Sequence, residues 1–196
     1  MRCGIHSGES PDQKCRSPRR FFNRTDAAWM APGQCWTMQT ASNTTGVMIE
    51  IALYQPDIAQ NAATTVRLAA CLGVKIHIIE PAGFVWNARD FRRAGMDYID
   101  QADIVRQPDW ATFAALHGDR RIVLATTRAD TNYTGFAFHG DDIILMGRES
   151  AGVPDHVHDA ATHRVTIPMQ QGTRSLNVAV ATGMIVGEAM RQTVWL

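Results

Sequence analysis

Long hydrophobic runs are missing from this 196-residue sequence. No apolar stretch approaches the roughly 18 residues that a membrane-spanning helix needs, and the first residues lack the apolar core of a secretory signal. We therefore expect neither a membrane span nor secretion, and we predict a cytoplasmic protein.

Cysteine pairs and net charge are missing as well. Cys3, Cys15 and Cys35 have spacings that match neither a CxxC pair nor a zinc knuckle. His156 and His158 are two positions apart, which does not place them on one face of a helix. We therefore predict no metal site. Lys and Arg together number 19, as do Asp and Glu, so any nucleic-acid surface must be local.

Residues 1–47 contain no leucine and one isoleucine, so they have no amphipathic period from which to build a core. We predict a disordered leader. A transit peptide is an alternative, against which Glu9, Asp12 and Asp26 argue. Another alternative is that the product starts at Met48 and that the leader belongs to an over-extended reading frame. In each case the length of the remainder, residues 48–196, suits one domain.

From residue 48 onward, strand-like and helix-like segments alternate. Short apolar runs with the β-branched content of buried strands cover residues 48–54, 75–79, 121–126, 142–146 and 165–167. Helical spacing covers residues 58–72 before Gly73, a basic segment around 87–95, residues 108–117 opened by Pro108, and residues 175–193. This alternation predicts an α/β fold with a mainly parallel sheet flanked by helices.

Glycine-rich phosphate loops do not follow the first strand, which disfavours a dinucleotide or nucleoside-triphosphate site. Glycines gather instead after later strands. Residues 145–154 read Leu-Met-Gly-Arg-Glu-Ser-Ala-Gly-Val-Pro, so a strand ends at Gly147, a carboxylate follows at Glu149, and Gly152 shapes a turn. A glycine at a strand end lets the backbone approach a ligand closely. An ordinary strand-to-helix loop is the alternative.

Two other segments accompany this loop. Residues 165–169 read Val-Thr-Ile-Pro-Met and residues 174–178 read Arg-Ser-Leu-Asn-Val, while residues 61–67 read Asn-Ala-Ala-Thr-Thr-Val-Arg. In this order they resemble the motifs of the SPOUT methyltransferases, with Ala63 and Thr64 standing where the family has Gly and Asn. The resemblance extends from residue 48 to about residue 192. The segments 77–81, 83–84 and 92–98 are similar to the members that methylate the wobble nucleotide of tRNA.

The resemblance implies a cofactor, a substrate and an assembly. The cofactor is S-adenosyl-L-methionine, and the reaction is 2'-O-methylation of cytidine 34 or uridine 34 in the anticodon stem-loop of tRNA. The chain is expected to form a homodimer and to contain a deep trefoil knot near its C-terminus.

The resemblance also implies roles for individual residues. Arg67 would be catalytic; because arginine stays charged in proteins, we expect it to orient a phosphate or to stabilise developing oxyanion charge. The phosphate could then accept the proton. Glu149 and Gly152 would organise their loop. The expected cofactor-binding residues are Ala125, Thr126, Gly147, Ile167, Met169, Ser175 and Leu176, and the expected substrate-binding residues are Asn61, Arg174 and Asn177.

Several of these residues have simpler interpretations. Ser175 could cap the final helix, and Arg67 could make a surface ion pair. Phe84 and Trp86 could stack on a base or anchor their own loop. Three arginines of the basic segment are candidates for phosphate contacts or for a solvated helix face: Arg89, Arg92 and Arg93. A related methyltransferase with another RNA target, or a binding protein without catalytic activity, is the alternative function.

Overall fold

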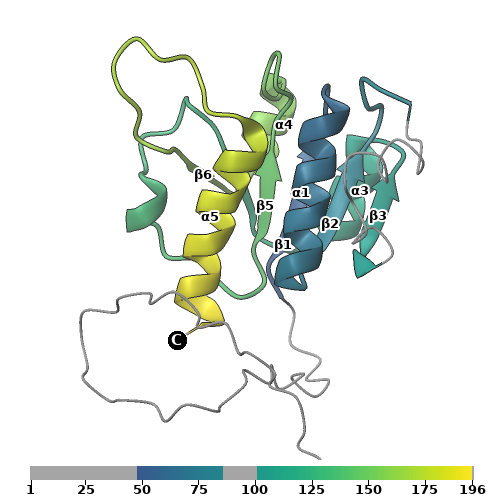
Figure 1. The fold of residues 1–196 in the computed structure, drawn as a ribbon, viewed down its shortest axis with the longest axis horizontal. Helices are drawn as coiled ribbons and strands as arrows, with labels where there is room; N and C mark the ends of the chain where they lie inside the picture. Colours follow the sequence, from purple (N-terminus) through teal and green to yellow (C-terminus); the bar gives the residue numbers. More distant parts are fainter. Residues whose placement is uncertain (1–47, 86–100, 196) are drawn as a thin grey trace, which may run out of the picture. The chain divides into compact units, whose positions relative to one another are not determined.

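The computed structural model describes residues 48–85 and 101–195. Within them lies a six-stranded sheet with the order β3-β2-β1-β5-β4-β6, in which all neighbouring strands are parallel (Figure 1). The strands are β1 (Glu50–Tyr54), β2 (Lys75–Ile79), β3 (Ile104–Gln107), β4 (Ile122–Ala125), β5 (Ile143–Met146) and β6 (His163–Val165). The predicted α/β fold with a parallel sheet is confirmed.

Helices cover both faces of the sheet. Those on the face turned to the viewer in Figure 1 are α1 (Ala59–Leu72) and α5 (Val178–Thr193). Those behind it are α3 (Trp110–His117) and α4 (Asp155–Ala160), and a short 3-10 turn, η2 (Tyr133–Gly135), precedes β5. None of the helices in the described ranges is long and apolar enough to cross a membrane.

Strand β1 shows why the sequence pattern is apolar throughout rather than alternating. Ile51 and Leu53 pack into the core that contains α1 and α5. Ala52 and Tyr54 pack into a second core on the other face, with Phe113 of α3. Because both faces of the strand are buried, every position favours an apolar side chain.

The order of the strands reverses at β1. The chain runs from β1 through α1 to β2 and then β3 on one side, whereas β5, β4 and β6 lie on the other side. The carboxyl ends of β1 and β5 are adjacent, since Leu53 is in register with Met146. Open parallel sheets bind their ligands at such a reversal, outside the carboxyl ends of the strands. This edge of the sheet is where a site is expected.

Two helix starts differ from the prediction. The helix predicted from Pro108 begins at Trp110, because the side chain of Asp109 caps it by accepting the Thr112 N–H at 2.7 Å. The helix predicted from Ser175 begins at Val178. In both cases a side chain that accepts backbone N–H groups sets the start.

Other segments were shifted or missed. The strand predicted at 165–167 is β6, which ends at Val165, so Thr166 and Ile167 belong to the loop after it. Strand β3, helix α4 and η2 were not predicted; each is short, and β3 reads Ile-Val-Arg-Gln, with two polar residues among its four. The basic helix predicted around 87–95 and the leader, residues 1–47, lie outside the described residues.

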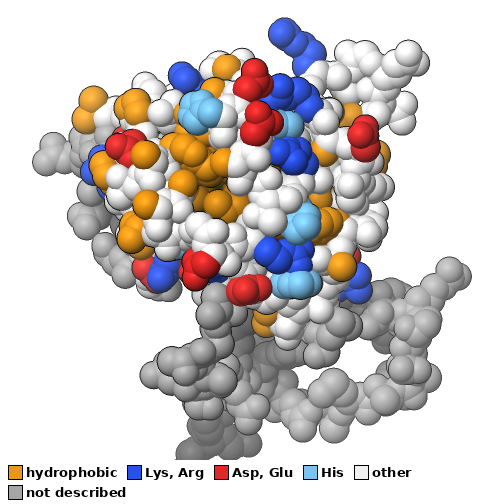
Figure 2. Space-filling model, turned by 180° about the vertical axis from the view of Figure 1, so that it is seen from behind, with side chains coloured by type: hydrophobic (Ala, Val, Ile, Leu, Met, Phe, Trp, Pro, Cys, Tyr) orange, Lys and Arg blue, Asp and Glu red, His pale blue; other side chains and the backbone are white. Residues whose placement is uncertain are grey.

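The face that carries α3 and α4 shows charges of both signs. Seen from behind in Figure 2, basic and acidic side chains are interspersed along the upper and the lower margin of this face. Hydrophobic side chains lie between these two margins. The described part of this face therefore has no continuous basic surface, in keeping with the balanced charge of the sequence.

Candidate active site

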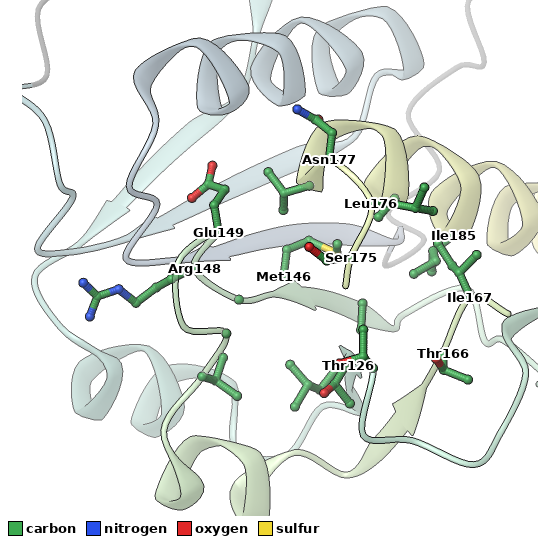
Figure 3. A pocket seen from close by; sticks show the side chains of 18 of the residues that line it. Thr126, Met146, Arg148, Glu149, Thr166, Ile167, Ser175, Leu176, Asn177 and Ile185 are labelled. Carbon is green, nitrogen blue, oxygen red and sulfur yellow. The ribbon is translucent and has the colours of Figure 1, made fainter. Parts of the chain in front are cut away.

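A cavity of about 410 Å³ lies at the carboxyl ends of β4, β5 and β6, beside the start of α5 (Figure 3). Its volume falls within the range typical of small-molecule sites, roughly 300 to 1,000 Å³. The apolar part comes from strand ends and from α5, and the polar part comes from the loops after β4, β5 and β6. Among the residues that line it are Ile58, Leu124, Thr126, Thr127, Met146, Arg148, Ser150, Thr166, Ala181 and Ile185.

Most residues expected from the sequence converge on this cavity. The lining includes Asn61, Ala125, Gly147, Glu149, Gly152, Ile167, Met169, Ser175, Leu176 and Asn177. Arg67 and Arg174 are not part of it. Segments more than 100 positions apart in the chain are thus brought to one place by the carboxyl edge of the sheet.

Several lining residues were not predicted. Arg148, Ser150 and Thr166 lie within the quoted motifs but were given no role, and Thr127 directly follows Thr126, which was expected at the site. Ala181 and Ile185 lie on α5 at a spacing of four residues, which places them on one face of the helix. Only the packing of α5 against the sheet shows that this face meets the cavity.

The loop after β5 forms a tight turn at the wall of the cavity. Arg148 and Gly152 exchange two backbone hydrogen bonds, with N–O distances of 3.0 and 2.9 Å. A Cβ atom at Gly147 would lie 2.8 Å from the carbonyl carbon of Gly152, closer than packed atoms approach, and Gly152 has a φ of +66°. The two glycines are therefore required by the turn itself.

A chain of side-chain hydrogen bonds joins the elements around the cavity. Asn177 donates from Nδ2 to Oδ1 of Asn61 at 2.9 Å, and Asn61 donates from Nδ2 to Oε1 of Glu149 at 3.0 Å. Oε2 of Glu149 accepts the backbone N–H of Asp57 at 2.9 Å. Both carboxylate oxygens of Glu149 are therefore engaged with the protein, and Figure 3 shows the side chain directed toward α1.

Asn177 is the residue that caps α5. Its Oδ1 accepts the backbone N–H groups of Ala179 and Val180 at 2.9 and 3.3 Å. The interpretation of Ser175 as the helix cap is therefore wrong, because the helix starts three residues later than predicted. Ser175 instead lines the cavity in the exposed segment that leads into α5.

Asp57 was not predicted, although it is the most connected side chain of this edge. Its Oδ2 accepts the hydroxyl and the backbone N–H of Ser150, and its Oδ1 accepts two guanidinium N–H groups of Arg148. The hydrogen bond from the Ser150 hydroxyl, aided by the Ser150 backbone and by Arg148, holds the pKa of Asp57 below its usual value despite partial burial. The motif comparison gave no signal at this position.

Arg67 lies outside the cavity but on a related surface. It is exposed on α1, and Gln60 and Thr64 precede it by seven and three positions, on the same face of the helix. Gln60 and Thr64 line a second hollow, which shares Asn61 and Asn177 with the cavity and also includes Ala179 and Val180. The asparagine pair therefore separates two neighbouring hollows.

Other expected residues do not join the site. Phe84 packs against the core of α1 and α5, as expected of a loop anchor. Trp86, Arg89, Arg92 and Arg93 lie outside the described residues.

One group in the described residues has the composition of a metal site. His139, Asp141 and Asp142 place their ligand atoms within 4.8 Å of one another at the amino end of β5, the end opposite the cavity. Asp142 is buried and pairs with Arg121 at 3.1 Å, and burial raises its pKa. This group therefore belongs to the amino edge of the sheet rather than to the candidate active site.

The SpoU rRNA Methylase family matches residues 48–187 of the chain. The chain is also similar to individual members with known names. It is 57% identical over 144 residues to the tRNA (cytidine(34)-2'-O)-methyltransferase of Beijerinckia indica, covering 72% of this chain and 90% of the relative. It is 35% identical over 147 residues to the enzyme of that name from Escherichia coli K12, covering 74% and 94%.

Solved structures share the fold. One, described as "Structural insights into the 2-OH methylation of C/U34 on tRNA", has a TM-score of 0.70 and 36% identity, with 74% of this chain and 95% of that chain covered. An AdoMet-bound rRNA methyltransferase from Sinorhizobium meliloti has a TM-score of 0.68 and 24% identity, with 74% and 56% covered. The latter similarity extends to the fold alone.

Proposed function

This chain belongs to the SpoU rRNA Methylase family, and on that premise we propose that it is an S-adenosyl-L-methionine-dependent tRNA 2'-O-methyltransferase acting on cytidine 34 or uridine 34. The observation that carries the proposal is the convergence of three distant motifs on one cavity. Asn61, the turn at 147–152 and the segment 167–177 line it together. We propose that the methyltransferase domain covers residues 48–196.

The lining of the cavity suits the proposed cofactor. A nucleoside needs an apolar slot with a few polar groups at its rim, and Ala125, Ile167, Met169 and Leu176 supply apolar surface beside loop backbone. Ser175 adds a hydroxyl next to them. When bound, S-adenosyl-L-methionine would supply an electrophilic methyl group on a sulfonium. The protein's own task is to hold the acceptor oxygen in line with that group.

The second hollow is proposed to receive the ribose that is methylated. It adjoins the cofactor cavity at Asn61 and Asn177, which are proposed to contact the substrate. Arg67, on the same helix face, would orient a substrate phosphate or stabilise charge developing on the 2'-oxygen. Glu149 is a poor general base here because both of its oxygens already accept hydrogen bonds. The substrate phosphate is the proposed proton acceptor.

The anticodon stem-loop of tRNA is the proposed substrate because similar proteins are named for that reaction. Arg174, exposed just before α5, is proposed to contact RNA phosphate together with Arg89, Arg92 and Arg93. Such contacts set the register of the RNA and the salt dependence of binding rather than the choice of base. A cytoplasmic location is proposed, in keeping with a tRNA substrate.

A homodimer is proposed from the surface next to the second hollow. Val180 and Met184, four positions apart on α5, are 54% and 38% exposed, and Val180 lines that hollow with Gln60 and Thr64 of α1. A second copy covering this surface would bury both apolar side chains and bring further groups to the ribose site.

A C-terminal trefoil knot is proposed as well. The segment between β4 and β5 is tied to the end of α5, because Gln192 accepts the Phe138 N–H at 3.0 Å and donates to the Phe136 carbonyl at 3.0 Å. This segment is the proposed loop around the C-terminal part of the chain.

Nucleoside mass spectrometry tests the substrate directly. In tRNA from cells lacking the gene, 2'-O-methylation at position 34 should disappear, and purified protein with S-adenosyl-L-methionine should restore it. Loss of methylation in rRNA, or at another tRNA position, with position 34 unchanged would assign a different RNA target. No change in any RNA, together with measurable cofactor binding, would identify a non-catalytic protein.

A further inference from the structure

The carboxylate of Asp57, in the loop between β1 and α1, contacts the turn after β5, in addition to the Asp57 N–H that donates to Glu149 of the turn. The two oxygens of Asp57 divide their partners: Oδ1 accepts Nε and Nη2 of Arg148, both at 3.3 Å, and Oδ2 accepts the Ser150 N–H at 3.1 Å and hydroxyl at 2.5 Å. Hydrogen bonds between ionised partners are stronger than neutral ones. The Asp57 side chain is 21% exposed, so water weakens them only in part.

The turn after β5 depends on contacts from outside itself. Its own backbone closes through the paired hydrogen bonds of Arg148 and Gly152, which fix its shape. Those bonds do not fix its position relative to the rest of the protein, which depends on Glu149, held by Asn61 at 3.0 Å, and on Arg148 and Ser150, held by Asp57. Arg148, Glu149 and Ser150 all line the cavity, so a shift of the turn would displace one wall of the cavity.

Asp57 is itself held firmly enough to serve as an anchor. Gln55, at the end of β1, has a φ of +44°, a left-handed conformation that is uncommon outside glycine. The loop after β2 packs directly on Asp57, because a Cβ atom at Gly83 would lie 3.0 Å from the Asp57 Cα. The Gly83 N–H also donates to the Pro56 carbonyl at 2.9 Å. The anchor is therefore supported from two strands of the sheet.

We propose that Asp57 is a positioning residue for cofactor binding: by accepting Arg148 and Ser150 on opposite oxygens, it holds the turn at 148–152 against the loop between β1 and α1 and so shapes the cofactor cavity. This inference rests on the proposed function, because it takes the cavity to be the S-adenosyl-L-methionine site. It assigns no contact between Asp57 and the methyl group or the RNA.

An isosteric substitution tests whether Asp57 must accept hydrogen bonds from Arg148 and Ser150 at the same time. Asp57→Asn keeps the shape but offers one acceptor and one donor, so either Arg148 or Ser150 faces a donor whichever way the amide is turned. We expect the Kd of the full-length protein for S-adenosyl-L-methionine, measured calorimetrically, to rise about tenfold. Turnover of tRNA at saturating cofactor should stay within about twofold of wild type, because Asp57 lies outside the reacting groups.

Two further variants separate positioning from a general loss of structure. Ser150→Ala removes one partner of Asp57 at an exposed position, and it should weaken cofactor binding about threefold. In the Asp57→Asn background its effect should be smaller than in the wild type, because both substitutions act on the same contact. Asp103→Asn removes a carboxylate that pairs with Lys75 at 3.8 Å, at the amino end of β3, and should leave both quantities unchanged.

The outcomes distinguish this inference from the proposed function. A wild-type protein that binds no S-adenosyl-L-methionine would overturn both. A wild-type protein that binds it, with Asp57→Asn binding within twofold as tightly, would overturn the positioning role alone. Independent effects of Asp57→Asn and Ser150→Ala, or a proportional fall of turnover, affinity and melting temperature, would also overturn it.

Discussion

The amides of Asn177 and Asn61 can be oriented in only one way. Oδ1 of Asn177 accepts two N–H groups of α5, which leaves Nδ2 to donate to Oδ1 of Asn61. Nδ2 of Asn61 must then face an acceptor, and it faces Oε1 of Glu149. The chain of donors therefore runs from the cap of α5 to the carboxylate of the turn, and its direction follows from the chemistry of the two ends.

This direction predicts the effect of Asn177→Asp. The carboxylate can still cap α5, but it places an acceptor against Oδ1 of Asn61, where two acceptors repel each other. We expect the melting temperature to stay within about 2 °C and the methylation rate to fall about tenfold. Thermal denaturation and a tRNA methylation assay measure the two quantities. Asn177→Ala should lower both, and a wild-type rate for Asn177→Asp would contradict the proposed role of the pair.

Arg67 is predicted to affect turnover without affecting the cofactor. It does not line the cavity, so Arg67→Ala should leave the Kd for S-adenosyl-L-methionine within about twofold, while single-turnover methylation falls at least about 100-fold. Arg191→Ala is the matched control, because Arg191 is an exposed arginine of α5 that pairs with Glu188 at 2.8 Å. Equal losses of affinity and turnover in Arg67→Ala would instead indicate a structural role.

Among the elements, the turn after β5 tolerates the least change. Gly147→Ala would put a Cβ atom 2.8 Å from the Gly152 backbone, so the turn must open or β5 must shift. Overpacking of this kind costs roughly 1 to 3 kcal/mol. We expect a lower melting temperature and at least about tenfold weaker cofactor binding. Gly135→Ala, in η2, meets no atom within 4 Å and serves as the control; similar behaviour of the two variants would refute this account of the turn.

Glu50 of β1, His77 of β2 and Arg120 form a charge cluster with little exposure to water, and this cluster predicts a pH dependence of stability. Burial alone would raise the pKa of Glu50, but hydrogen bonds from His77 at 2.6 Å and from Arg120 outweigh burial and lower it to about 2. His117 is also close, with its ring 4.8 Å from that of His77. The ordinary pKa of 4.5 applies when the chain is unfolded, so this stabilisation is complete above about pH 4.5 and is lost as the pH falls toward 2.

Glu50→Gln should therefore lower the free energy of unfolding by on the order of 2 kcal/mol at pH 7 and by progressively less below pH 4.5. Urea unfolding at pH 7, 4 and 3 measures the difference. Asp103→Asn should show no comparable trend, since Asp103 is 64% exposed. A difference between wild type and Glu50→Gln that stays constant down to pH 3 would argue against the cluster as its source.

For the whole molecule, the sequence predicted those strands and helices that are determined by the pattern of their own residues. The apolar runs identified five of the six described strands, since strands buried on both faces need apolar residues at each position. The helix over 59–72 was predicted with its end at Gly73. Strand β3 was not predicted, because half of its residues are polar and its burial depends on its neighbour β2.

The site was partly predictable for a similar reason. Motif similarity identified glycines and loop residues that line the cavity, because those motifs are continuous in the sequence. Asp57 could not be found in this way, since its partners Arg148 and Ser150 lie more than 90 positions away. Only the adjacency of β1 and β5 brings these residues together.

The proposed homodimer gives a prediction about assembly. Val180→Asp places a charge on the surface that α1 and α5 are proposed to offer to a second copy, so we expect a monomer by light scattering and a large loss of methylation. Leu116→Asp changes an apolar side chain of α3 that is even more exposed, 62% against 54%, and should leave the assembly intact. A Val180→Asp protein of unchanged mass would place the interface elsewhere.

The hydrogen bond between Asn61 and Asn177 also bears on the order of events during synthesis. Its two residues are 116 positions apart, and α5, the last described helix, supplies one side of the cavity. A nascent chain that still holds this helix inside the ribosome has the sheet strands but no complete cavity. We therefore expect cofactor binding only after α5 has left the ribosome, and truncated products that end before α5 should compete for neither cofactor nor tRNA.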